Sequence, residues 1–124
     1  MALHTELPIY KVAYDLLCVA TDYVVNMPRA VKHCVGTRLT DLCVELVMLI
    51  LRANCARDKG PHLTALLERN EEAGMLFRLC RDKKFISRDQ YASAVELIQQ
   101  LQAARQYMEQ NCNKGKTGFG YEFK

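Results

Sequence analysis

Residues 39–51, LTDLCVELVMLIL, are the stretch that decides the fold of this chain. On a helix at about 100° per residue, the aliphatic residues and Cys43 would cover roughly 220° of the circumference. A helix that packs on one side of a small domain needs an apolar stripe only a little over about 100° wide. Asp41, Glu45 and Arg52 leave only a narrow strip suited to water. The excess predicts a second contact, most simply another copy of the chain, through Val44, Val47, Met48 and Leu51.

Three further helical patterns flank this stretch. The first begins at Pro8, a residue suited to a first helical turn, and ends at Met27-Pro28. The second helix, which contains residues 39–51, starts between Arg29 and Thr37 and runs to about residue 57. After Gly60-Pro61 a third helix covers about residues 62–83.

The fourth helix has the clearest start signal in the chain. Ser87 and Gln90 have the spacing of a capping box, and Ile86 and Tyr91 are positioned as the flanking hydrophobic staple. The apolar pattern then continues to about residue 112. The final residues, 112–124, combine lysines, glycines and aromatics, and we expect them to form a flexible, basic and aromatic C-terminal tail.

These patterns predict the fold class. No segment alternates as a half-buried strand does, and short connections favour antiparallel neighbours. We therefore expect an all-α protein, an antiparallel up-down four-helix bundle over residues 1–111. The 124 residues suffice for one domain with a real core, not for two.

Composition and cysteine placement narrow the functional classes. No apolar run is long enough to cross a bilayer and no secretory signal is visible, so we expect a cytoplasmic protein without a membrane contact. Cys18, Cys43, Cys55 and Cys80 fall within helical patterns and are expected to be reduced and buried. Metal-ligand spacing and a convergent catalytic set are both absent from the sequence. We expect no metal, no cofactor and no enzymatic activity.

Basic residues give the functional lead. Arg78 and Arg81 lie one turn apart, Lys83 and Lys84 close the same helix, and Arg52 and Arg57 end the second helix. Each could simply form ion pairs or meet a helix dipole. If subunits assemble, however, each cluster is multiplied, and the six residues become candidates for nucleic-acid binding that weakens steeply with salt. The tail could stack on bases, serve as a peptide for a partner protein, or have no binding role.

The order of motifs resembles a known family. LPIYK at residues 7–11, MPR at 27–29 and VGTRL at 35–39 are followed by LRANCARDK at 51–59, RLCRDKKFIS at 78–87 and QYASAVELI at 90–98. Together they resemble bacterial four-helix-bundle proteins of the Avd type, the accessory variability determinants of diversity-generating retroelements. The resemblance covers about residues 7–110. After Leu101 the chain departs from the family, which often has Gly-Gly-Trp where this sequence has QAARQYMEQ.

The resemblance implies a homopentameric barrel of four-helix bundles that binds the retroelement reverse transcriptase, template RNA and cDNA and supports mutagenic retrohoming without chemistry of its own. A related branch, encoded in intervening sequences of ribosomal RNA genes, gives the alternative of a structural oligomer that binds nucleic acid without a polymerase partner. A third hypothesis is a metal- or redox-responsive regulator that uses His33 and Cys34.

Overall fold

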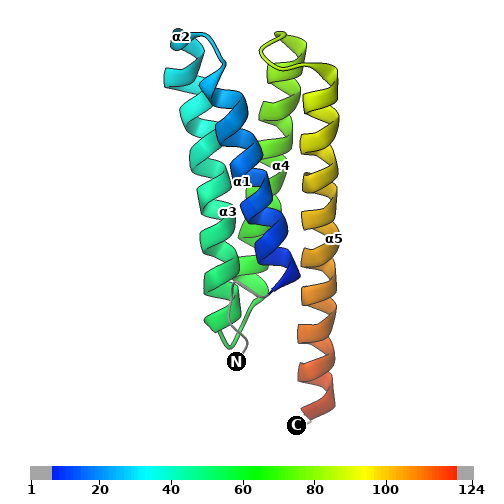
Figure 1. Cartoon of the computed structure of the whole chain (residues 1–124). Coiled ribbons are helices and arrows are strands. Elements are labelled where there is room, and N and C mark those ends of the chain that lie inside the picture. Colours follow the sequence, from blue (N-terminus) through cyan, green and yellow to red (C-terminus); the bar gives the residue numbers. More distant parts are fainter. Residues whose placement is uncertain (1–6, 120–124) are drawn as a thin grey trace.

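Four long antiparallel helices make up the fold (Figure 1). The computed structural model describes residues 7–119, with side chains through residue 110. The helices are α1 (Pro8–Val25), α3 (Thr37–Cys55), α4 (Gly60–Asp82) and α5 (Arg88–Phe119). A short helix α2 (Arg29–Val31) and a π-helical segment η2 (Lys32–Gly36) lead directly into α3. Residues 7–119 contain no strand, so the all-α four-helix prediction is confirmed.

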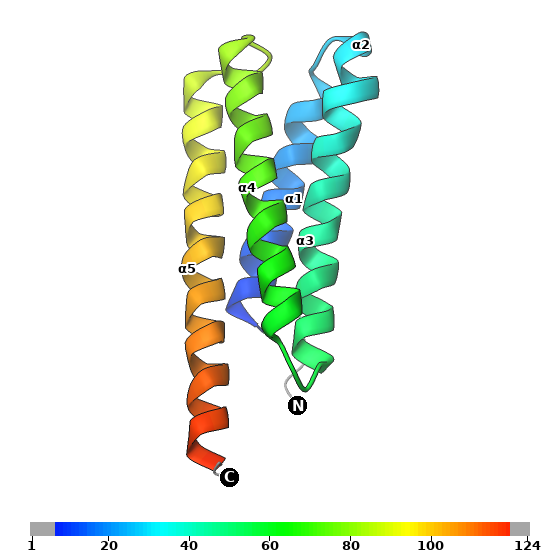
Figure 2. The ribbon, with the colours of Figure 1, turned by 180° about the vertical axis from the view of Figure 1, so that it is seen from behind.

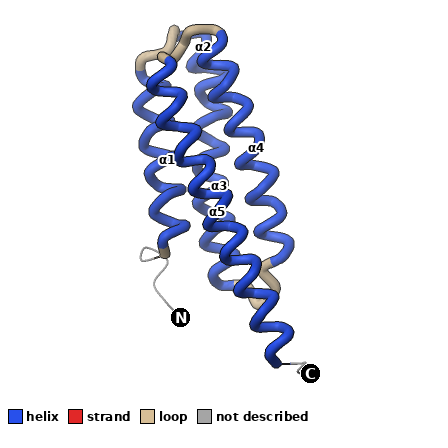
Figure 3. The backbone as a smooth tube through the Cα atoms, turned by 90° about the vertical axis from the view of Figure 1, so that its right-hand side faces the viewer, coloured by secondary structure: helices blue, strands red, loops and turns tan. Residues whose placement is uncertain are grey.

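Each long helix packs against two others. α1 packs against α3 and α5, and α4 packs against the same two helices from the other side (Figures 1 and 2). The side view shows that the C-terminal part of α5 projects beyond the other three helices (Figure 3). Among the described residues, no helix combines the length and apolar character that crossing a bilayer requires.

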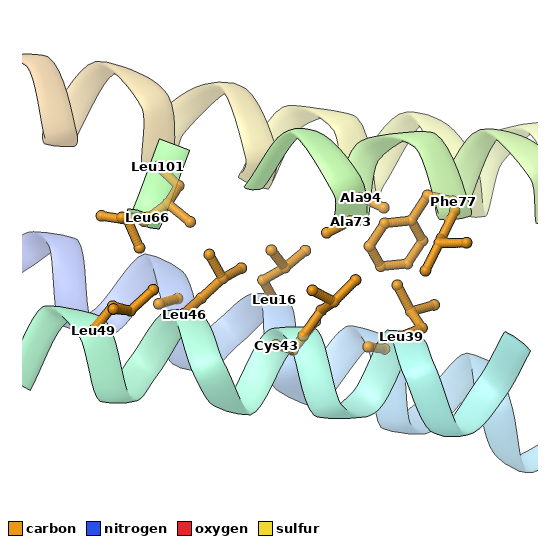
Figure 4. Packing of buried hydrophobic residues seen from close by; sticks show 14 of the residues in the cluster. Leu16, Leu39, Cys43, Leu46, Leu49, Leu66, Ala73, Phe77, Ala94 and Leu101 are labelled. Atoms are coloured by element: carbon orange, nitrogen blue, oxygen red, sulfur yellow. The ribbon is translucent and has the colours of Figure 1, made fainter. Parts of the chain in front are cut away.

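The core runs along the bundle axis and is almost wholly aliphatic. Leu16, Leu39, Leu46, Phe77 and Leu101 are fully buried, and their side chains interdigitate between the four helices (Figure 4). Burying each such side chain contributes about 1.5–3 kcal/mol, so this cluster drives bundle formation. Leu39 and Leu46 belong to the stretch quoted first, which accordingly lies at the centre of the fold.

Two polar or charged side chains are buried among the described residues, Asn70 and Arg105. Asn70 on α4 is 2% exposed, its Nδ2 donates to the Ile98 carbonyl of α5 at 3.1 Å, and its Oδ1 has no partner. Leaving a buried carbonyl oxygen unpaired destabilises a fold by about 1–3 kcal/mol. Asn70 therefore ties α4 to α5 while lowering the stability of the core.

The predicted helix starts are confirmed at two positions. Pro8 occupies the first turn of α1. At α5 the Gln90 N–H donates to Ser87 Oγ at 3.0 Å, while the Ser87 N–H donates to Gln90 Oε1 at 2.8 Å. This reciprocal pair is the capping box that the sequence predicted, and Ile86 beside it is buried.

The ends of two helices differ from the prediction. α4 begins at Gly60, with Pro61 in its first turn, because a proline there gives up no hydrogen bond. α5 passes residue 112 and continues to Phe119. No proline stops it, and glycine disfavours a helix by only about 1 kcal/mol per residue. Residues 120–124 of the predicted tail lie outside the described residues.

The second helix begins at Arg29, within the predicted interval, and then widens into η2. Its Gly36 is a point of close approach: a Cβ placed there would lie 2.9 Å from Val24 Cγ1 of α1. Beside it, the hydroxyl of Thr37 donates to the Lys32 carbonyl at 2.9 Å, which satisfies an acceptor within the widened turn. Glycine therefore lets α1 pack tightly on the start of α3.

The prediction that four cysteines are buried is half wrong. Cys43 and Cys80 lie in the core, and burial raises the pKa of both thiols, that of Cys43 to about 12. Cys18 and Cys55, like Cys34, are exposed. Cys18 lies two positions from the buried Leu16, and two residues turn a helix by about 200°, to the opposite face.

Candidate nucleic-acid interface

The α4–α5 turn is built by a defined C-terminal cap. The Phe85 N–H donates to the Cys80 carbonyl at 2.8 Å and the Lys84 N–H donates to the Arg81 carbonyl at 3.0 Å. These two bonds form a Schellman motif, which requires a left-handed residue, usually glycine, just after the helix. Here that residue is Lys84, with φ 64°. The turn thus presents Lys83 and Lys84 at the surface, both exposed.

Two contacts hold the side chain of Arg81 in place beside this turn. Its guanidinium carbon lies 4.5 Å from the centroid of the Tyr91 ring, in a cation–π contact between α4 and α5. Its Nε and one terminal nitrogen donate to Asp82 Oδ1 at 3.1 and 2.8 Å. These hydrogen bonds from Arg81 lower the pKa of the Asp82 carboxyl. Two of the donors of Arg81 are therefore already engaged.

A groove of about 890 Å³ opens at this turn, between the end of α4 and the start of α5. Arg81, Lys84, Phe85, Arg88 and Tyr91 line it. It therefore combines three cationic groups and two aromatic rings with one carboxylate, that of Asp82. This composition suits a ligand that carries both negative charge and flat apolar surfaces.

The charges around the groove are unevenly balanced. Arg78 lies 4.0 Å from Asp82, so this carboxylate partly neutralises both Arg78 and Arg81. Within the described part of the chain, neither Lys83, Lys84 nor Arg88 forms a salt bridge. Asp89 is the acidic group nearest in sequence to Arg88. Lys83, Lys84 and Arg88 are therefore the cations at the turn that have no ion-pair partner in the described part of the chain.

Further basic residues lie at the same end of the bundle. The segment that carries Arg29 and Lys32 reaches this end from the α1–α3 side (Figures 1 and 2). Acidic Asp22, in the last turn of α1, lies there too. Arg38, the second residue of α3, is instead paired with Glu72 of α4 at 2.7 Å. We call the following group the basic end: Arg29, Lys32, Arg78, Arg81, Lys83, Lys84 and Arg88.

The structure divides the six predicted binding residues between the two ends of the bundle. Arg78, Arg81, Lys83 and Lys84 come together around the α4–α5 turn. Arg52 is exposed in the last turn of α3, and Arg57 is exposed in the α3–α4 connection at the opposite end (Figure 1). Beside them, Lys59 Nζ donates to the Ala53 carbonyl at 2.6 Å and so caps α3. A single protomer therefore has two separate basic regions.

Sequence reasoning missed three of the groove residues named above: Phe85, Arg88 and Tyr91. The sequence places Tyr91 in the hydrophobic staple. It does not reveal that the Tyr91 ring lies beneath Arg81, because this contact depends on how α4 packs against α5, which the spacing of apolar residues does not show. Arg88 had a readable signal: it directly follows the capping Ser87, and a residue in that position projects from the start of a helix.

The outer face of α3 carries the apolar residues predicted for self-association. Val44 and Met48 are 44% and 41% exposed. Leu51 is partly buried on the same outward side, whereas Val47 packs against the core. The bundle therefore uses most of the wide apolar arc of α3 and leaves Val44, Met48 and Leu51, here named the α3 strip, at the surface.

The described side chains contain no group of three or more histidine, cysteine or acidic residues that could hold a metal. No family model matches the chain, and neither a curated protein nor a solved structure shows significant similarity to it. The candidate site therefore has to be interpreted from its own geometry.

Proposed function

We propose that this chain is a non-catalytic, nucleic-acid-binding accessory subunit of a diversity-generating retroelement, assembling into a ring that binds the reverse transcriptase and its template RNA or cDNA. The observation that carries the proposal is the groove at the α4–α5 turn. Its cations project from a rigid, capped turn, and Lys83, Lys84 and Arg88 have no salt-bridge partner among the described residues. The resemblance of the sequence to the Avd type supplies the retroelement context.

Binding at this end would be electrostatic. Each phosphate neutralised by a lysine or arginine releases a counterion, so affinity falls steeply as salt rises. One protomer offers few contacts, and a modest patch gives weak binding. In a ring, several basic ends would act on one strand, and the apparent affinity would rise through effective concentration without any new contact.

The α3 strip supports the assembly part of the proposal. Large exposed aliphatic side chains in the middle of a helix that otherwise supplies the core favour burial against another protomer. Met75 and Leu79 on α4 are also exposed, at 60% and 37%, and offer further apolar surface for burial against another protomer. A pentamer is the number that the resemblance implies.

RNA binding by charge-matched variants tests the proposal. Lys83→Gln/Lys84→Gln removes two cations from the basic end, and Arg52→Gln/Arg57→Gln removes two from the opposite end. Fluorescence anisotropy across a salt series should show the lysine variant binding more weakly. Its salt slope on a single strand should fall by about 0.7 for each phosphate that the variant no longer neutralises. Equal effects of the two variants would mean that the basic end is not the main site.

Copurification separates the retroelement role from the ribosomal intervening-sequence alternative. Tagged chain, coexpressed with a retroelement reverse transcriptase and its template RNA, should retain both. Retention of RNA without the enzyme would favour the alternative, a nucleic-acid-binding oligomer with no polymerase partner. Retention of neither would refute both.

A further inference from the structure

We infer that the groove at the α4–α5 turn binds an unpaired nucleotide, with its base stacked on the Arg81 guanidinium and its phosphates on Lys84 and Arg88, so that the protein prefers single strands to duplex. The inference rests on the proposed function, since it specifies the nucleic acid that the basic end accepts. It is carried by the contacts of Arg81.

Arg81 is poorly placed to act as a free phosphate clamp. Its guanidinium carbon lies over the Tyr91 ring, and two of its donors point at Asp82. The side chain is nevertheless 33% exposed, and it borders the groove. What remains available to a ligand is chiefly the part of this planar, charged group that is turned away from Tyr91 and Asp82. Nucleobases stack on such arginine planes as they do on aromatic rings.

The neighbouring residues fit the rest of a nucleotide. Phe85 adds a half-buried aromatic surface to the same groove. Lys84 and Arg88 flank it with cationic groups that form no salt bridge in the described chain, while the carboxylate of Asp82 disfavours anions beside Arg81. Phosphates are therefore directed to the lysine side of the groove and the base to the arginine plane.

Base pairing would prevent this arrangement. In a duplex both faces of each base are covered by neighbouring pairs, and only groove edges and phosphates are accessible. A single strand can turn a base outward and stack it without breaking base pairs. The preference for single strands therefore follows from stacking on the Arg81 guanidinium, whereas the cations alone would bind single strands and duplexes alike.

The test compares a single-stranded oligouridylate with a hairpin duplex of equal phosphate number, by anisotropy of the full chain. Arg81→Lys keeps the charge and removes the plane. It should weaken binding to the single strand about tenfold, a typical loss for one stacked base, and leave duplex binding within about twofold. Because the phosphate contacts remain, the salt slope should not change.

A second pair of variants guards against altered folding. Tyr91→Leu keeps the hydrophobic staple but removes the ring beneath Arg81, and should reproduce the selective loss. Tyr91→Phe keeps the ring and should bind as the wild type does. Equal losses on both oligonucleotides, or no preference by the wild type, would overturn the inference while leaving the proposed function standing. Wild-type protein that binds neither oligonucleotide would refute the proposed function itself.

Discussion

Replacing Lys84 with glycine should stabilise the protein while weakening its binding to RNA. Lys84 has φ 64°, and an L-residue in that region is disfavoured by about 1–2 kcal/mol. Glycine removes this strain but gives the unfolded chain more freedom, which offsets about 0.5–1 kcal/mol. The net gain expected for Lys84→Gly is about 0.5–1 kcal/mol in the free energy of unfolding, or roughly 2–4 °C in Tm for a domain of this size.

Lys83 offers a matched control one residue away. It carries the same exposed charge but has φ −86° and ψ 1°, which any residue adopts. Lys83→Gly therefore relieves nothing and should lose about 0.5–1 kcal/mol through the unfolded state. The two glycine variants should thus shift stability in opposite directions although each removes one lysine.

Urea denaturation followed by circular dichroism, at one protein concentration for all variants, measures both effects. Both glycine variants should also reduce the salt slope of RNA binding. A Lys84→Gly protein that is less stable than the wild type would refute the reasoning about the turn, as would equal shifts in the two variants. A stable Lys84→Gly protein with undiminished RNA affinity would show that the strained lysine is not retained for binding.

Three further predictions address the bundle. Gly36→Ala should destabilise the fold by about 1–3 kcal/mol in urea titrations, because its Cβ would lie 2.9 Å from Val24 Cγ1. Adding Val24→Ala should recover part of this lost stability, and no recovery would contradict the contact. The exposed thiols should react with Ellman's reagent in the folded protein. Cys43 should react only on unfolding, because burial raises the pKa of its thiol to about 12. Rapid labelling of Cys43 would argue against its burial. Hydrogen bonding to Arg38 lowers the pKa of Glu72. The pair therefore stabilises the fold above the ordinary carboxylate pKa, and this contribution is lost as pH falls through the lowered pKa. The urea midpoint of Glu72→Gln should depend less on acid pH than that of the wild type, and an unchanged dependence would exclude the pair.

The sequence was sufficient for the fold because its signals are local. The period of the apolar residues, Pro8 in a first turn and the Ser87–Gln90 capping box all act within a few residues, and the structure confirms each of them. Positions on the far side of a helix were harder to assign, as Cys18 shows. Its aliphatic neighbours in the sequence suggested burial, but the helix turns it away from the core.

The candidate site was only partly predictable because it depends on pairings between helices. Arg78, Arg81, Lys83 and Lys84 could be grouped from spacing alone. The Tyr91 ring beneath Arg81 and the engagement of Arg81 by Asp82 follow from how the α4–α5 turn closes. Likewise, the separation of Arg52 and Arg57 from the other four follows from the antiparallel course of the chain, which places the two ends of α4 at opposite ends of the bundle.

Self-association through the α3 strip is the central part of the proposed function, because it would bring the basic ends of several protomers together into one surface. Sedimentation velocity of the wild type and of Met48→Asp tests it most directly. We expect the wild type to sediment as one species several times heavier than the 14.2 kDa chain, and Met48→Asp to shift toward a helical monomer. A wild-type protein that sediments only as a folded 14.2 kDa monomer at micromolar concentration would contradict the claim.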